Sequence, residues 1–292
     1  MEHVTHYFDA ARLGQFINYI IERENVRIRK ERGDPKPWTD DPLLRQYRFT
    51  NIRREDDYVT RWIAKNWRTP NADDPDFWFA AYVARQINEP ATLARLGYPV
   101  PFDPEHFLRV MDEPNPGGEK LYRAAYMVRS SSEYKGRSKA EYLAEKEFGP
   151  AWERRIYLRP RPTDTLRSYH RRLVQEQYGM GSFIAAQVVA DTKFTGLMRN
   201  ADDWITFAAP GPGSRRGLNV LKGRDPEAKW NESDWLRTLR ELIAVVAPEL
   251  KDRAGIVLSA QDYQNNLCEA SKLFRGYSKQ KYRAPPEAIA AE

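Results

Sequence analysis

Apolar residues recur along almost the whole chain at the three- and four-residue spacing that places them on one face of an α-helix. One such stripe near the start consists of Leu13, Phe16, Ile17, Ile20 and Ile21. The same spacing predicts helices over 117–131, 138–156 and 164–178. No convincing alternation of apolar and polar positions is present, so any β structure would be a short hairpin. The pattern therefore predicts an all-α protein.

Several helix starts are marked by a polar residue followed by proline, which fits the first helical turn. They lie at Asp74-Pro75, Asn88-Glu89-Pro90 and Asp103-Pro104. Near the end, Ser259 and Asp262 resemble a capping box that opens a further helix. A break rich in proline and glycine at 113–118 suggests two lobes, 1–115 and 116–283, within a single helical domain. Residues 284–292 are predicted to be a frayed tail.

The composition is that of a globular protein, with 41% hydrophobic and 30% charged residues among 292. No apolar run is long enough to span a bilayer, and the N-terminus has no signal pattern, so we expect an intracellular protein away from membranes. Cys268 is the single cysteine, which excludes an internal disulfide and any CxxC metal site. No metal site is predicted, because the histidines are scattered: His3, His6, His106 and His170.

Positive charge is concentrated in three segments. The formal net charge is +6, but residues 23–68 and 153–175 each carry a net +5 and residues 268–283 a net +4. If these segments converge in space, they form an electropositive face suited to a phosphate backbone. The alternative is three solvated surfaces that never meet, because charge clustering alone is weak evidence.

The most informative local motif is the run Gly179-Met180-Gly181-Ser182-Phe183, which lies between two apolar helical segments. Two glycines allow a sharp turn between helices. The free N–H groups of the second helix start can then bind a phosphate, which makes Gly179, Gly181 and Ser182 candidate phosphate ligands. The alternative is an ordinary hairpin of two helices. No strand precedes the motif, which argues against a dinucleotide site.

A second motif, at 209–218, is rich in glycine and proline and then doubly basic. A loop of this kind can present N–H groups and guanidinium groups to phosphates. Its candidate ligands are Gly211, Gly213, Ser214, Arg215 and Arg216. The chain contains no GxxxxGK[ST] sequence, so phosphoryl transfer of the P-loop kind is disfavoured. The alternative is a surface loop with two solvated arginines.

A third motif combines 37–42 with 47–55, where polar side chains lie among aromatic ones that can stack on a base. Its candidate base-binding and phosphate-binding residues are Trp38, Arg48, Asn51, Arg53 and Arg54. An asparagine in such a place is more often a structural cap than a base reader.

The fourth motif is a helix face that carries Glu269 and Lys272. The simplest interpretation is a surface ion pair of little energetic value. If the pair is buried beside a phosphate, it can position or deprotonate an amine.

The order of these motifs is more specific than any one of them. PWTxDP, YRFTNIRRE, GMGSFIAAQVVAD, APGPGSRRGL and LCEASKLFR follow one another along the chain. Together they resemble the helical domain found with phage 5-hydroxymethyluracil DNA kinases. Its stand-alone relatives are the alpha-glutamyl/putrescinyl thymine pyrophosphorylases, or amino acid:DNA transferases. The resemblance spans roughly residues 10 to 283 and implies a divergent helix-hairpin-helix DNA glycosylase fold.

The resemblance implies a transferase that acts on double-stranded phage DNA in the cytoplasm of an infected bacterium. A coupled kinase pathway activates hydroxymethyluracil as a pyrophosphate ester, and the transferase replaces pyrophosphate with the amine of an amino acid or polyamine. No resident cofactor is expected, although a transient Mg²⁺ on pyrophosphate is compatible with this chemistry. The target base must leave the stack, so base flipping is expected.

Residues inside the motifs are assigned roles by this resemblance. Arg215 and Arg216, with Arg48, Arg53 or Arg54, are candidates for stabilising the pyrophosphate. Candidates for handling the amine or reading the base edge are Asp191, Glu269, Lys272, Asn51, Gln187 and Trp38. Each of these side chains, taken alone, is more often structural than catalytic.

Three other functions remain open. A DNA glycosylase of the lyase type is excluded, because Phe183 stands where such enzymes carry lysine; a monofunctional glycosylase using Asp202 or Asp203 survives. A non-catalytic DNA-binding module that recruits a modification enzyme needs only the basic segments. Action on RNA or tRNA is compatible with the same charge.

Overall fold

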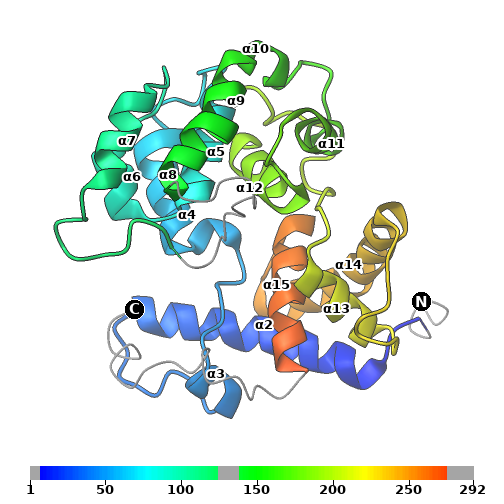
Figure 1. Cartoon of the computed structure of the whole chain (residues 1–292). Helices are drawn as coiled ribbons and strands as arrows, with labels where there is room; N and C mark the ends of the chain where they lie inside the picture. The colour runs from blue at the N-terminus through cyan, green and yellow to red at the C-terminus, as the bar shows by residue number, and fades with distance from the viewer. Residues whose placement is uncertain (1–6, 124–137, 275–292) are drawn as a thin grey trace. The chain divides into compact units, whose positions relative to one another are not determined.

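The computed structural model describes residues 7–123 and 138–274, and no strand occurs within them (Figure 1). The all-α prediction is confirmed over this part of the chain. The chain divides into two compact units. Unit 1 combines the two ends of the chain, residues 1–57 and 208–292, and unit 2 is the continuous stretch 58–207. None of the described helices is both long and apolar enough to cross a membrane.

Unit 1 is built on two long helices and several shorter ones. Asp9 caps the first helix through a bond from Arg12 N, and Asn231 caps the helix that ends at Gly255 in the left-handed region. The bounds are α2 (Ala10–Glu31), α3 (Pro42–Gln46), η1 (Arg54–Asp56), α13 (Pro212–Leu221), α14 (Glu232–Ala254) and α15 (Ala260–Leu273). The predicted capping box at Ser259 and Asp262 is present.

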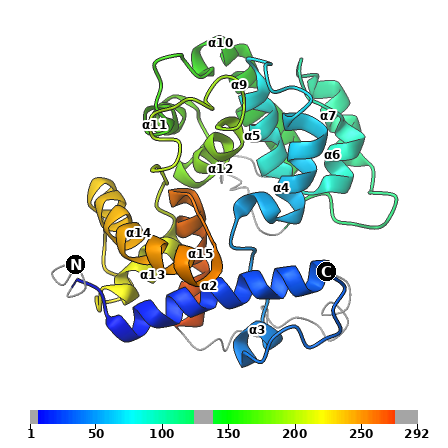
Figure 2. The same cartoon turned by 180° about the vertical axis from the view of Figure 1, so that it is seen from behind.

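The core of unit 1 lies where α2 packs against α13, α14 and α15 (Figure 2). Its side chains come from both ends of the sequence and are all fully or almost fully buried: Phe16, Ile20, Leu239, Leu242, Val246 and Leu267. The first helix therefore belongs with the last ones, which is why the unit boundary lies at 57/58 and 207/208 instead of at the suggested break near 115. The segment 113–118 lies inside unit 2, where the Asn115 amide bonds to Thr92 Oγ1.

The segment predicted as a glycine-rich loop forms a helix instead. Gly211 is the N-cap of α13, Pro212 occupies its first turn, and Ser214 Oγ accepts a hydrogen bond from Gly211 N at 3.0 Å. A Cβ atom on Gly213 would lie 2.3 Å from Cys268 Sγ, and one on Gly217 would lie 2.1 Å from the Leu267 carbonyl oxygen. The glycines therefore allow close packing of α13 on α15. From the sequence alone, glycines that permit such packing look the same as the glycines of a flexible loop.

Unit 2 surrounds one buried helix. Every residue of α5 (Phe77–Ile87) is buried, and its aromatic side chains meet rings such as Phe148 and Trp152. The other elements are α4 (Tyr58–Ile63), η2 (Ala64–Arg68), α6 (Pro90–Leu96), α7 (Pro104–Asp112), α8 (Lys139–Tyr142), η4 (Leu143–Phe148), α9 (Gly149–Glu153), α10 (Arg155–Leu158), α11 (Leu166–Glu176) and α12 (Ser182–Thr192).

Most helix predictions for unit 2 are confirmed. The segment 138–156 is covered by α8, η4, α9 and part of α10, and α11 lies within 164–178. The predicted pair of helices joined by a glycine turn is α11 and α12. The helix expected over 117–131 was wrong for residues 117–123, which are not helical, and its remainder lies outside the described residues. The predicted tail, 284–292, also lies outside them.

Candidate functional site

The segment 49–57 of unit 1 is held by side chains of α2. Arg23 Nε donates to the carbonyl oxygens of Phe49 at 3.3 Å and Thr50 at 3.1 Å, and its Nη2 donates to Asn51 Oδ1 at 2.6 Å. The Asn51 amide nitrogen donates to the carbonyl oxygen of Asp56 at 2.9 Å. Both ends of the Asn51 amide are thus used inside the fold, so Asn51 shapes this segment.

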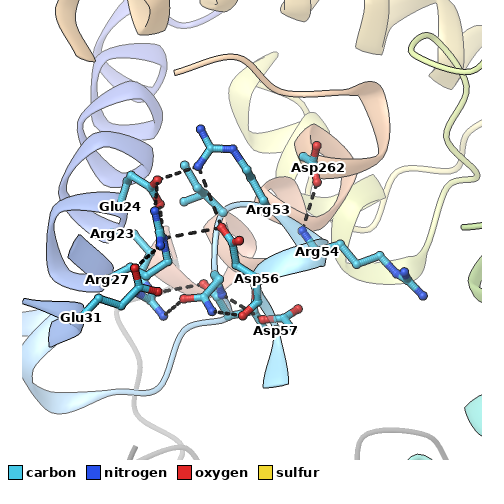
Figure 3. Close-up of polar contacts among 12 residues, drawn as sticks. Arg23, Glu24, Arg27, Glu31, Arg53, Arg54, Asp56, Asp57 and Asp262 are labelled. Atoms are coloured by element: carbon cyan, nitrogen blue, oxygen red, sulfur yellow. Dashed lines mark hydrogen bonds and ion pairs between the residues drawn. The ribbon is translucent and has the colours of Figure 1, made fainter. Parts of the chain in front are cut away.

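Helix α15 holds the same segment from another side. Asn265 Nδ2 donates to Thr50 Oγ1 at 3.1 Å, and Asn266 Nδ2 donates to the Ile52 carbonyl oxygen at 2.8 Å. The Arg54 amide donates to Asp262 Oδ1 at 3.1 Å (Figure 3). Residues 48–53 of the YRFTNIRRE motif are therefore a non-helical segment fixed by α2 and α15, and Arg54 and Glu55 begin η1.

An ion-pair network covers the basic face of α2. Glu24 Oε1 accepts from Arg27 Nη2 at 2.8 Å and from Arg53 Nη1 at 2.6 Å, while Arg27 also meets Glu31 and Asp56 (Figure 3). Burial acts to raise the pKa of Glu24, but the bonds from Arg27 and Arg53 outweigh it and the pKa falls below its usual range. The Arg53 guanidinium therefore pairs with acidic side chains of unit 1. Its role in phosphate binding stays a prediction.

The pair predicted on α15 is formed, and its carboxylate is buried. Lys272 Nζ lies 2.6 Å from Glu269 Oε1, and Thr50 N donates to Glu269 Oε2 at 3.3 Å. Glu269 is only 4% exposed, whereas the Lys272 side chain is 21% exposed. The pair is therefore not the solvated surface pair of the simplest interpretation: an acid is held inside, and a partly exposed ammonium contacts it.

Two further groups lie in the electrostatic field of Glu269. The Tyr19 hydroxyl, on α2, is buried and has no hydrogen-bond partner among the described residues. Burial, and then the charge of Glu269, raise the pKa of Tyr19 well above its ordinary value. Burial and Glu269 also raise the pKa of the Cys268 thiol to about 11, against the charges of Lys272 and Arg216. We call Glu269, Lys272, Tyr19 and Cys268 the α15 cluster.

The first turn of α13 packs beside this cluster through Gly213 and Cys268. Ser214 is fully buried and its hydroxyl bonds to Gly211 at the cap of its own helix, so the predicted loop cradle of N–H groups is replaced by a helix start. Arg216 Nε pairs with Glu227 at 2.8 Å, and Arg215 Nε is buried without a hydrogen bond to the described residues. Phosphate binding here stays a prediction, and it now concerns the first turn of a helix.

In unit 2, the turn between α11 and α12 is fixed by a buried acid. Gly179 has φ +78°, and a Cβ atom there would lie 2.6 Å from the Glu147 carboxyl carbon. Gln177 Nε2 donates to the Glu147 carbonyl oxygen at 3.2 Å, and the Glu147 carboxylate accepts from Tyr82 Oη and from Gln86 Nε2. Burial raises the pKa of Glu147 despite these two bonds. Glycine is required at this turn for both conformation and space.

The predicted phosphate-binding end of α12 is accessible. Gly181 is its N-cap, Ser182 is exposed, and the Ser182 carbonyl oxygen lies 2.9 Å from His170 Nε2. Tyr178 and Phe183 beside it are 59% and 46% exposed. The end of the helix therefore carries large exposed rings beside its first-turn N–H groups, and Gln187 lies half-buried one turn further along α12.

Asp191, at the other end of α12, is completely buried. Arg85 binds it with two bonds, Nε to Oδ2 at 2.6 Å and Nη2 to Oδ1 at 2.7 Å, and also reaches Thr60 Oγ1. Arg68 Nη1 lies 3.8 Å from Oδ1. Asp191 thus joins α12 to α5 within unit 2, while Glu269 lies in unit 1.

The remaining predicted residues are distributed around these sites. Trp38 donates its indole N–H to the Asp34 carbonyl oxygen, and Arg48 is exposed. Asp203, a candidate of the glycosylase alternative, accepts from Leu166 N at 2.6 Å and Arg167 N at 3.0 Å and so caps α11. No group of three His, Cys, Asp or Glu side chains that could hold a metal ion occurs in the described ranges.

Comparison with known proteins places these sites in a family. The model of the family described as "5-hmdU DNA kinase, helical domain" matches residues 10–283. The chain belongs to this family. A stretch of 122 residues is 32% identical to the 5-hmdU DNA kinase of Bacillus phage SP10, covering 39% of this chain and only 19% of that kinase. No solved structure matches the chain.

Membership in the kinase-associated helical family confirms the coarser part of the sequence interpretation. The matched range contains every predicted site residue, including both Asp191 and Glu269. Transferase activity and the glycosylase-like fold stay predictions.

Sequence reasoning missed four residues that shape the sites of this family member: Tyr19, Arg23, Arg85 and Glu147. Arg85 carried a readable signal, because it is a lone charge in the apolar run 77–87 and such a charge needs a buried partner. No sequence signal marked Glu147 or Tyr19, because their partners lie far away in sequence.

Proposed function

We propose that this protein takes part in hydroxymethyluracil modification of DNA as a transferase that replaces pyrophosphate on the base with an amine. The observation that carries the proposal is the α15 cluster, where a buried carboxylate contacts a partly exposed ammonium beside the first turn of α13. Family membership supports the DNA context, and the lack of a P-loop sequence favours a step other than phosphorylation.

The proposed reaction forms a C–N bond and breaks a C–O bond at the methylene carbon of the base. Pyrophosphate leaves with the electron pair of the C–O bond, and a proton leaves the attacking amine. Glu269 is the proposed acceptor of that proton, because a buried carboxylate close to an ammonium can hold the incoming amine and then deprotonate it. Lys272 pairs with Glu269 before the amine arrives.

Cations are needed where the leaving group develops charge. Arg215 and Arg216 lie on α13, whose first turn contacts Cys268 through Gly213, within the same unit as Glu269. We assign them to the pyrophosphate. Asp191 is given a structural role in this scheme, because Arg85 already neutralises its buried charge.

The test is transfer onto DNA that carries pyrophosphorylated hydroxymethyluracil, with amino acids and polyamines supplied and nucleosides analysed by mass spectrometry. We expect an amine adduct with release of pyrophosphate. The variant Glu269→Gln should lose about a hundredfold or more in rate, in line with removal of a general base. Glu249→Gln, an exposed glutamate on α14, is the matched control and should react like the wild type.

Other products would replace this proposal with a different function. Free base with an abasic site would establish a glycosylase. An unchanged base, with tight and salt-sensitive DNA binding, would indicate a binding module instead. Equal rates for Glu269→Gln and wild type would remove the α15 cluster from the chemistry.

A further inference from the structure

An open pocket of about 440 Å³ lies in unit 1 beside α2, within the size range of small-molecule sites. Glu22 and Arg29 of α2 form one wall, and the segment Pro37-Trp38-Thr39-Asp40-Asp41 forms the other. The pocket is therefore made largely by the PWTxDP motif. The reaction proposed at the α15 cluster does not use this motif.

Most polar groups of this pocket are already satisfied by the fold. Glu22 accepts from Arg29 Nη1 at 2.9 Å and from Asn25 Nδ2 at 3.2 Å. Asp41 Oδ1 accepts from Leu43 N and Leu44 N and so caps α3. Thr39 is 6% exposed, and its hydroxyl accepts from Asp41 N at 3.1 Å. These bonds hold both walls of the pocket within the fold of unit 1.

Two charged groups of opposite sign remain available in the lining. The exposed Asp40 carboxylate forms no hydrogen bond or ion pair with the described residues. Arg29 uses Nη1 for its bonds to Glu22 and to the Trp38 carbonyl oxygen, and its Nη2 and Nε make none with the described part of the chain. One carboxylate and one guanidinium edge are thus left for a ligand.

The charge balance around the pocket argues against a polycation. Three carboxylates line it, but Arg29 lines it too, and the ammonium groups of Lys36 and Lys30 lie 4.8 and 5.7 Å from the centre of the Trp38 ring. A diamine would bring two more positive charges beside these three cations. A ligand with one ammonium and one carboxylate matches both available groups and keeps the site neutral.

We propose that this pocket binds a free α-amino acid, with its ammonium group on Asp40 and its carboxylate on Arg29. The role of the bound molecule rests on the proposed function: it is the amine donor, held on the same unit as Glu269. The binding itself needs no DNA, so it can be tested separately from transfer.

The first experiment is calorimetric titration of the full chain with glycine and with L-glutamate, without DNA. Both should bind saturably. Glycinamide lacks the carboxylate charge, N-acetylglycine lacks the ammonium, and putrescine has two ammonium groups; each should bind at least tenfold more weakly, since one lost ion pair of about 1.4 kcal/mol is worth a factor of ten. Equal or tighter binding of putrescine would overturn the amino-acid assignment.

The matched variants are Asp40→Asn and Asp34→Asn. Both carboxylates are exposed on the same stretch of chain, but Asp34 does not line the pocket. We expect Asp40→Asn to weaken amino-acid binding about tenfold and Asp34→Asn to leave it unchanged, with the same melting temperature in both. Unchanged binding in Asp40→Asn would place the site elsewhere, and no binding by the wild type would remove it.

Transfer kinetics separate this inference from the proposed function. For Asp40→Asn, the KM for the amino acid should rise about tenfold while kcat stays near the wild-type value. A wild-type KM in this variant would keep the transferase and overturn the pocket. Amino-acid binding that depends on Asp40, with no transfer to DNA, would keep the pocket and overturn the transferase.

Discussion

Two buried carboxylates, Asp191 in unit 2 and Glu269 in unit 1, have opposite surroundings. Asp191 is fully buried and is bound at both oxygens by Arg85, which is itself 2% exposed. Glu269 is almost as deeply buried, but its cation, Lys272, is partly exposed, and the Tyr19 hydroxyl in its field has no hydrogen-bond partner in the part of the chain that the structure describes. The Asp191–Arg85 pair is thus wholly inside the fold, whereas the Glu269–Lys272 pair is buried on the carboxylate side and reaches solvent on the ammonium side.

The largest expected loss of stability follows from breaking the ion pair between Asp191 and Arg85. Asp191→Ala leaves the Arg85 guanidinium buried without its counter-charge, so it should lower the free energy of unfolding by about 3–5 kcal/mol. Denaturant titration followed by circular dichroism measures this loss. The double variant Arg85→Met/Asp191→Leu should be clearly more stable than Asp191→Ala, because the most deeply buried cation, Arg85, is removed together with its counter-charge. An equal loss in both variants would contradict this account of the pair.

A smaller loss of stability is expected from disturbing the close contact between α13 and α15, the helix that carries Glu269. Gly217→Ala would place a Cβ atom 2.1 Å from the Leu267 carbonyl oxygen, so it should cost about 1–3 kcal/mol of stability through forced separation of the helices. Gly14→Ala is the control: Gly14 lies in α2 with no atom within 4 Å of the new Cβ, and this change should stabilise by about 0.5–1 kcal/mol. Thermal unfolding of both variants measures these two changes in stability.

The smallest effect is a pH dependence carried by Glu147. Its pKa is raised in the folded state, so the protonated form is favoured there, and stability should fall as the pH rises from the ordinary glutamate range through that raised pKa. Each unit by which the pKa is raised corresponds to about 1.4 kcal/mol. Glu147→Gln keeps an acceptor for Tyr82 and removes the titration, so its unfolding free energy should depend less on pH over that interval. Parallel pH profiles for variant and wild type would contradict this.

The sequence predicted many helices and caps because their signals are local, although the helix expected to start at Asp74-Pro75 begins only at Phe77. Asp103 before Pro104 and the pair Ser259 and Asp262 cap their helices as expected, and the Glu269–Lys272 pair follows from helical spacing. The partners that decide burial are not local. Arg85 lies 106 residues from Asp191, and Tyr19 lies on a helix at the opposite end of the chain from Glu269.

Glycine was the residue type most easily misread. At Gly179 the sequence correctly indicated a turn, which the positive φ confirms. At Gly213 and Gly217 the same composition indicated a loop, but the glycines lie in a helix and permit close contact with another helix. A glycine in the sequence can serve either a positive φ angle or a close contact that a Cβ atom would block. Only the packing in the folded structure shows which of the two applies.

The division of the chain has a consequence for the order in which the protein is assembled during translation. Unit 2 is one uninterrupted stretch, whereas the core of unit 1 needs α2 from the beginning of the chain and α14 and α15 from its end. Unit 2 can therefore complete its core before the residues that follow position 207 have been synthesised. The apolar face of α2, with Phe16 and Ile20, gains its cover only when α13, α14 and α15 have followed unit 2 along the chain.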